Sequence, residues 1–230
     1  GSLSEGTLGA IVREDWSEAS FLVRMVPALR PKLKTTALRD QRDQLLALAR
    51  TPMDRSDLHV RLLNSVYRAI TLEQTCPPRF GPHWERIGFQ GDDPSTDLRG
   101  AGMLALLQAL HLSSRRPKLL RAIFELSANG TSFPMMTVSI NMTQVVLTAL
   151  RSGAGFKEAN AMRQTPHAMH EALHTLHAAC FCHMMLAWQE RKLSIADFGF
   201  LKKEIERLAF KRPNTLLKRL KAFESGGTTS

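Results

Sequence analysis

The residues best suited to chemistry lie in segment 84–102, where a loop rich in Gly and Asp leads to a single arginine, Arg99. Large apolar side chains are rare in this polar stretch, so we expect those present to hold the loop on a core: Trp84, Ile87 and Phe89. Turns are expected at Gly88, Gly91 and Pro94. The sequence therefore predicts a long loop that is fixed in place and presents an arginine.

Arg99 conflicts with the local structure predicted for it. Ser95, Thr96 or Asp97 can cap the next helix, which would place Arg99 in its first turn, where the helix dipole disfavours a cation. Gly100 and Gly102 each disfavour helix by about 1 kcal/mol relative to alanine, but they allow another backbone to approach closely. Such conflicts are typical of functional sites. Two interpretations stay open: Arg99 pairs with Asp92, Asp93 or Asp97 as a clamp, or it is exposed and acts on a partner.

A second chemical pattern is His170-Glu171-Ala172-Leu173-His174, which reads H-E-x-x-H. On a helix the two histidines share a face and could bind zinc, with Glu171 as general base of a metallopeptidase. However, we find no strand that could hold a peptide substrate, and the extended motif needs a glycine where this chain has His177. We therefore expect no metal and keep His170, His174 and Glu171 as the less favoured alternative.

The composition is that of a globular protein. The chain has 230 residues, 43% hydrophobic and 23% charged, which fits one domain. We find neither a membrane-spanning run nor a secretory signal, and Gly1-Ser2 resembles a cloning scar. Three cysteines are typical of a reducing compartment, so we expect a cytoplasmic protein.

The net charge of +10 is concentrated near the C-terminus. Residues 202–221 contain eight Lys or Arg against Glu204 and Glu206, which suits anionic lipid, nucleic acid or an acidic protein, or only a solvated helix face. No helix-turn-helix, zinc-finger or RNP pattern is present, so we expect no nucleic acid. Apolar residues among these cations could lie on an anionic membrane, although packing in the core is the favoured interpretation: Leu216, Leu217, Leu220 and Phe223.

The elements that must position these residues are helices. Apolar residues recur at three- and four-residue spacing, including the β-rich stretch 135–146, which we interpret as a buried helix. We predict helices at 16–29, 36–50, 56–72, 96–112, 116–128, 134–151, 165–192 and 194–223. Caps are expected at Thr165 with Pro166, at Ser194 with Asp197, and at the stops Asn129-Gly130 and Gly153. Residues 75–94 form the long loop.

The domain organisation follows from these helices. We expect a flexible N-terminus over 1–15, N-terminal helices over 16–55 packed on the domain, a main domain over 56–223 and a disordered tail over 224–230.

The loop also resembles a known family. The block W-x-x-I-G-F-Q-G-x-D-P-x-T-D-L-R-G-x-G-x-L-x-L, dense over 84–107, is similar to the signature of the ELMO domain. It is most similar to the ELMO-domain-containing proteins that act as GTPase-activating proteins for ARF and ARL GTPases. Leu98 stands where the family often has Phe, and Ala105 where it often has Gly. A looser likeness extends to Trp188 and 195–198.

The resemblance implies a single compact, all-α, multi-helix ELMO domain with an N-terminal helical extension. Arg99 matches the family's catalytic arginine, which is supplied to an ARF or ARL small GTPase, so this chain would not itself be a hydrolase. GTP and Mg²⁺ would belong to the partner, and the chain would have no cofactor of its own. Supporting loop residues would be Trp84, Gly88, Phe89, Gln90, Asp93, Pro94, Thr96, Asp97, Gly100 and Gly102, with Gln90 and Asp97 orienting the arginine.

The engulfment-scaffold branch of the family is thought to lack that arginine and the activity. The alternative function is therefore a scaffold or effector at a membrane or the cytoskeleton. We expect a cytoplasmic monomer, peripheral on endomembranes or near actin.

Overall fold

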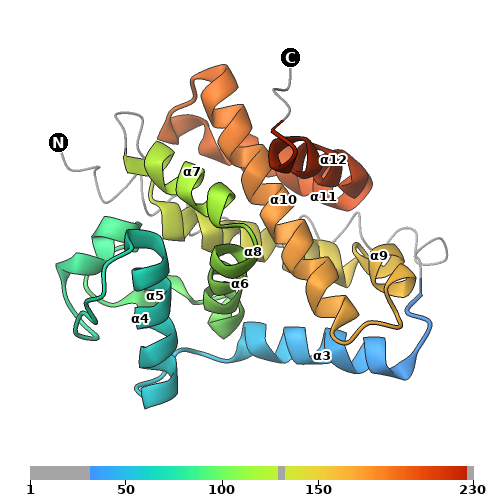
Figure 1. Ribbon diagram of the computed structural model, residues 1–230, viewed down its shortest axis with the longest axis horizontal. Coiled ribbons are helices and arrows are strands. Elements are labelled where there is room, and N and C mark those ends of the chain that lie inside the picture. The colour runs from blue at the N-terminus through green and yellow to red at the C-terminus, as the bar shows by residue number, and fades with distance from the viewer. Residues whose placement is uncertain (1–31, 129–132, 227–230) are drawn as a thin grey trace.

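The structure, a computed structural model, describes residues 32–128 and 133–226, and within these residues every regular element is a helix (Figure 1). The all-α prediction is therefore confirmed. In chain order the elements are α3 (Thr36–Arg50), α4 (Asp57–Thr71), the 3₁₀ helix η2 (Pro82–Ile87), α5 (Pro94–Asp97), α6 (Gly102–Arg115), α7 (Pro117–Ala128), α8 (Met135–Arg151), α9 (Phe156–Ala161), α10 (Ala168–Arg191), the 3₁₀ helix η3 (Ile195–Asp197), α11 (Phe198–Lys211) and α12 (Pro213–Glu224).

Helices α8 and α10 form the centre of the molecule. Helix α8 is buried on nearly every side, which confirms that the β-rich stretch 135–146 is a buried helix. Helix α10 crosses the whole molecule in Figure 1 and packs against α3, α6, α7, α8, α9, α11 and α12. Its largest buried side chains, Phe181 and Trp188, contribute to the same core.

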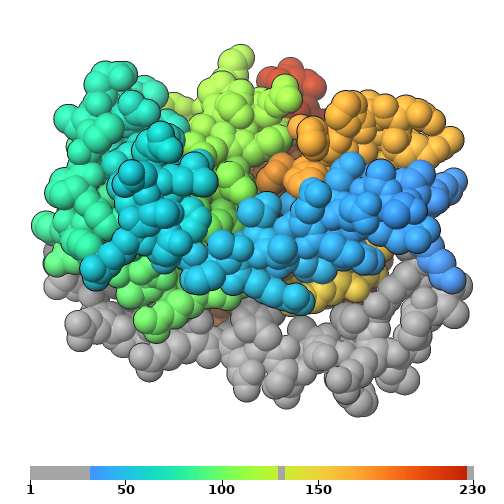
Figure 2. Space-filling model, turned by 90° about the horizontal axis from the view of Figure 1, so that it is seen from below, coloured from blue at the N-terminus to red at the C-terminus, as the bar shows by residue number. Residues whose placement is uncertain are grey.

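Helix α3 lies across one face of the molecule, beside the start of α4 (Figure 2). The Thr35 hydroxyl accepts the Leu38 N–H at 3.2 Å and so caps the helix. The apolar stripe Leu38, Leu45 and Ala49 is buried, and the helix packs against α6 and α10. The helix predicted at 36–50 is confirmed, and its position makes it part of the support for α6.

Three predicted helix boundaries are wrong. The helix expected at 96–112 is two elements, α5 and α6, joined by a turn. The helix expected at 194–223 is divided at Pro213, whose ring nitrogen has no N–H to continue the α11 ladder. Helix α10 begins at Ala168, not at Thr165, because the Thr165 N–H and hydroxyl both donate to the Met162 carbonyl after α9. The short helix α9 was not predicted.

Other predicted caps are confirmed. Gly153 adopts a left-handed conformation (φ 91°) after α8 and donates to the Leu150 carbonyl at 3.0 Å. Ser194 and Asp197 form the predicted capping box. The helix expected at 16–29 and the stop at Asn129-Gly130 lie outside the described residues, as does most of the predicted C-terminal tail. Of the helices in the described ranges, none has the length and hydropathy to cross a membrane.

Candidate functional site

The apolar anchors of the loop are buried. Trp84 and Ile87 are fully inaccessible and Phe89 nearly so, which confirms the prediction that they hold the loop on the core. The Trp84 indole packs edge-on against Tyr67 and Phe89, with ring centroids 5.6 and 6.2 Å away. Its Nε1 donates to the Arg79 carbonyl at 3.1 Å. The loop therefore has a fixed aromatic base, and part of it forms the unpredicted helix η2.

Gly88 joins the loop to the start of α8. Its carbonyl oxygen accepts both the Thr137 N–H at 3.0 Å and the Thr137 hydroxyl at 2.9 Å. Helix α8 has no side-chain cap of its own, so this carbonyl serves one of its unpaired first-turn N–H groups. Gly88 has φ 87°, and a Cβ there would lie 2.2 Å from the Met135 nitrogen. Only glycine fits this position without rearrangement.

Asp97 fixes the loop from within. It is buried, and its Oδ2 accepts the Gln90 N–H at 2.6 Å, so the structure brings these two predicted orienting residues together. Burial raises the pKa of Asp97 to about 6, and the nearby Asp93 carboxylate adds to the rise, while the bond from Gln90 opposes it. This hydrogen bond therefore joins two parts of the loop just before the turn that holds Arg99.

Asp93, and not Ser95, Thr96 or Asp97, caps the helix that follows the loop. Its Oδ1 accepts the Ser95 N–H at 2.9 Å, and Pro94 occupies the first position of α5. The same oxygen pairs with Arg79 Nη2 at 2.6 Å. The predicted cap was wrong because Ser95, Thr96 and Asp97 are all residues that commonly cap helices, whereas the cap is Asp93, the residue before Pro94.

Arg99 lies in the turn between α5 and α6, not in the first turn of a helix as predicted. Its neighbours Leu98 and Ala101 are buried, and the Leu98 carbonyl accepts the N–H groups of Ala101 and Gly102 at 3.1 and 2.7 Å. The Arg99 side chain is exposed. Within residues 32–128 and 133–226 it makes no hydrogen bond or ion pair. The clamp interpretation is therefore wrong for this part of the chain, since Asp93 and Asp97 are occupied by other groups.

Gly102 lets α6 begin directly against the end of α3. A Cβ on Gly102 would lie 2.6 Å from the Ala49 carbonyl oxygen and 2.7 Å from those of Leu48 and Thr51. The Met103 N–H, at the start of α6, donates to the Thr51 carbonyl at 3.0 Å. The prediction that a glycine here allows a close backbone approach is confirmed. The positive φ of Gly100 (89°) completes the turn beside Arg99.

Together these contacts fix the turn that holds the Arg99 guanidinium, which has no partner among residues 32–128 and 133–226. Leu98 and Ala105, the two departures from the family pattern, are both buried and so serve the packing below the turn. A planar guanidinium presented in this way can donate to two oxygens of one anion. The site therefore presents an exposed cation that can bind an anionic group of another molecule.

The histidines of the H-E-x-x-H pattern are arranged differently from a zinc site. The His174 ring stacks on His111 of α6, with centroids 4.4 Å apart. Glu171 faces His111 Nε2 at 3.4 Å and Arg115 at 3.8 Å. Burial, with neighbouring positive groups, lowers the pKa of His174 to about 3. Among the described residues no three His, Cys, Asp or Glu side chains are grouped to hold a metal ion. Sequence reasoning missed His111 because it comes from another helix.

The basic C-terminal segment contributes its leucines to the core. Leu216 and Leu220 are buried, which confirms core packing over membrane contact for these two. Lys202, counted among the eight cations, is also buried. Lys218 and Lys221 remain exposed on α12.

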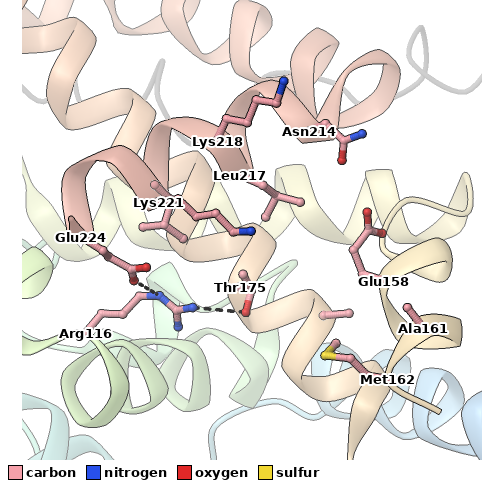
Figure 3. A pocket seen from close by; sticks show the side chains of 12 residues that line it. Arg116, Glu158, Ala161, Met162, Thr175, Asn214, Leu217, Lys218, Lys221 and Glu224 are labelled. Carbon is pink, nitrogen blue, oxygen red and sulfur yellow. Dashed lines mark hydrogen bonds and ion pairs between the residues drawn. The ribbon is translucent and has the colours of Figure 1, made fainter. Parts of the chain in front are cut away.

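A cavity of about 530 Å³ lies between α9, α10 and α12, away from the loop (Figure 3). Its walls are largely apolar, with Met162 and Leu217 facing each other. Arg116 at its edge is held by Glu224 at 2.9 Å and by the Thr175 hydroxyl at 3.3 Å. No residue of segment 84–102 lines the cavity, and no pattern in the sequence predicts it.

Comparisons with known proteins converge on one family. The profile of the ELMO/CED-12 family matches residues 43–202, which include the whole loop and Arg99. The chain is 37% identical over 197 residues to human ELMO domain-containing protein 3, covering 84% of this chain and 50% of that protein. It is 30% identical over 141 residues to human ELMO domain-containing protein 2, covering 60% and 46%. It is 28% identical over 161 residues to ELMO domain-containing protein B of Dictyostelium discoideum, covering 67% of this chain and 54% of that protein. The chain thus spans about half the length of these relatives, and no solved structure matches it.

Proposed function

We propose that this chain, which belongs to the ELMO/CED-12 family, is a GTPase-activating protein that supplies Arg99 to the active site of an ARF- or ARL-family small GTPase. The observation that carries the proposal is the exposed Arg99 guanidinium, unpaired in the described chain and held on a turn whose neighbours are buried. A side chain with only a structural role at this position would be expected to have a partner.

The chemistry follows from the needs of GTP hydrolysis. The GTPase brings GTP, Mg²⁺ and the attacking water, but negative charge spreads over the β–γ bridge and γ-phosphate oxygens in the transition state. A guanidinium delivered from a partner stabilises that charge and can raise the rate by about 10³ to 10⁵. In this reading the chain completes the partner's active site and catalyses no reaction alone.

The arrangement of the loop supports such a role. Electrostatic stabilisation of a transition state requires a cation that is already in position, so that little reorganisation is needed during the reaction. The bonds Asp97–Gln90, Gly88–Thr137 and Met103–Thr51 fix the backbone on both sides of the Arg99 turn. Only the Arg99 side chain has to adjust when the GTPase binds.

Cellular placement belongs to the same proposal. A cytoplasmic protein could meet such GTPases on endomembranes or near actin, and the exposed Lys218 and Lys221 could add a weak contact with anionic lipid.

The test is a panel of GTP-loaded ARF and ARL proteins, in which single-turnover hydrolysis is measured with wild type, Arg99→Lys and Arg115→Lys. Arg115 is an exposed arginine at the other end of α6, roughly 20 Å away by helix rise, and serves as the matched control. We expect wild type and Arg115→Lys to stimulate at least one GTPase. Arg99→Lys should lose nearly all stimulation while its thermal stability stays unchanged.

Two results would contradict the proposal. If Arg99→Lys stimulates hydrolysis as well as wild type, Arg99 is not the catalytic cation. If the chain binds a GTPase of the panel but accelerates GTP hydrolysis by none of them, it is an effector or scaffold and not an activator.

A further inference from the structure

Phe80 is a large apolar side chain that remains 47% exposed at the edge of the loop. Two guanidinium groups lie over its ring. Arg79 Cζ is 4.7 Å from the ring centroid and Arg55 Cζ is 5.7 Å from it. Both distances are within the range of cation–π attraction, so the ring is held by charged groups from two separate segments.

The position of Phe80 is fixed by the same contacts that fix the loop. Arg79 is paired with Asp93 at 2.6 Å, and Asp93 caps the helix that leads to Arg99. On the other side of Phe80, the Gly81 N–H donates to the Asp92 carbonyl at 3.0 Å. Phe80 and Arg99 therefore lie in one segment whose parts are joined by these contacts.

The charge of this surface is also defined. Asp93 neutralises Arg79, whereas Arg55 is exposed and forms no ion pair within the described part of the chain. The surface thus offers a rigid aromatic ring beside one uncompensated positive charge. Aromatic residues and arginine are enriched at the centres of protein interfaces, where they carry much of the binding energy.

We propose that Phe80, with Arg55 and Arg79, is the docking surface for the GTPase that receives Arg99. This inference rests on the proposed function and names the contact that holds the partner. The matching face of the GTPase would have an apolar depression for the ring, with a carboxylate beside it facing Arg55. In this arrangement Phe80 provides affinity and Arg99 provides the rate.

The division of roles can be measured with the responsive GTPase of the panel. The variants are Phe80→Ala, Phe80→Tyr and Phe200→Ala, tested in the full chain. Phe200 is 80% exposed on α11, which packs against α8, α10 and α12, so its removal controls for loss of an exposed phenylalanine. Tyr keeps a ring in contact with the two guanidinium groups and controls for disturbance of the loop.

We expect Phe80→Ala to raise KM for the GTP-bound GTPase at least tenfold, with kcat within twofold of wild type. Phe200→Ala should stay within twofold in both constants, and Phe80→Tyr, which keeps the ring, should raise KM less than Phe80→Ala does. Arg55→Glu should slow association and reduce its dependence on salt, because a long-range attraction has been reversed. A KM of Phe80→Ala equal to that of Phe200→Ala would overturn the proposal.

A binding measurement separates this proposal from the proposed function. The affinity of each variant for GTPase loaded with a non-hydrolysable GTP analogue is measured in the Arg99→Lys background. Loss of binding on Phe80→Ala supports the docking surface even if Arg99 proves to have no effect on hydrolysis. Binding that is unaffected by Phe80→Ala, or absent across the whole panel, rejects the docking surface whatever the role of Arg99.

Discussion

The Gly88 carbonyl accepts two hydrogen bonds from Thr137, one from the backbone N–H and one from the hydroxyl. The two residues are 49 positions apart in the chain, so this contact joins the functional loop to the first turn of the buried helix α8. Any change that moves Gly88 therefore moves both the loop and the centre of the core.

Replacement of Gly88 should be severely destabilising. Alanine at Gly88 meets the α8 backbone, with the Cβ 2.2 Å from Met135 N, and it also carries the strain of φ 87°. We expect a loss of more than about 3 kcal/mol in the free energy of unfolding, measured by urea denaturation. Gly91→Ala is the matched control, because φ there is 73° but no atom lies within 4 Å of the added Cβ. It should cost only about 1 kcal/mol. Equal losses for the two variants would show that the contact with α8 does not matter.

Asp97 should make stability depend on pH. Its pKa is raised to about 6 in the folded protein, whereas an unfolded Asp titrates near 3.9. The unfolded chain therefore releases this proton first, and the contribution of Asp97 to stability is lost as the pH rises from 4 to 6. We expect Asp97→Asn to gain stability relative to wild type over this window, by about 3 kcal/mol at most. Urea denaturation of both proteins at pH 4, 5, 6 and 7 measures the difference, and a difference constant with pH would contradict the prediction.

Replacement of Gln108 by an apolar residue should stabilise the protein. It is 1% exposed, and neither its amide oxygen nor its amide nitrogen has a hydrogen-bond partner in residues 32–128 and 133–226. Burying such a group without a partner is costly, so Gln108→Leu should raise the free energy of unfolding by about 1 to 2 kcal/mol. Gln189→Leu, on the exposed end of α10, should change it by less than about 0.5 kcal/mol. A destabilised Gln108→Leu would show that the amide is paired in solution.

His174 should make the protein sensitive to acid. Burial lowers the pKa of His174 to about 3, whereas an unfolded histidine binds a proton near 6.5. Stability from the neutral imidazole is therefore complete above pH 6.5 and is lost as the pH falls towards 3. His174→Gln keeps a polar group but cannot titrate, so its unfolding free energy should fall less than that of wild type between pH 6.5 and 4. Parallel curves for the two proteins would rule out this origin of acid sensitivity.

The sequence predicts those parts of the fold that depend on local pattern. Leu38, Leu45 and Ala49 follow a helical period, and the buried anchors Trp84 and Ile87 stand out in a polar stretch. The position of Arg99 was predicted only in part. The segment was correct, but a turn replaced the predicted helix start, because the helical ladder begins only where Gly102 meets the end of α3.

Contacts between distant segments could not be predicted. Nothing in the neighbours of Thr51 indicates that its carbonyl caps α6, and nothing near Phe80 indicates the approach of Arg55. Such contacts depend on how helices pack, and a single sequence carries no local signal for them.

The bond from Met103 to the Thr51 carbonyl sets a lower limit on the smallest fragment that can work. At this junction the carbonyl end of α3 meets the amide end of α6, so each helix end supplies a partner for a backbone group of the other. A truncation that starts at α4 would remove that carbonyl and also the end of α3, against which Gly102 packs beside the Arg99 turn. We therefore expect a functional fragment to begin no later than Thr35, whose hydroxyl caps α3, so that this helix is retained in any shortened version of the protein.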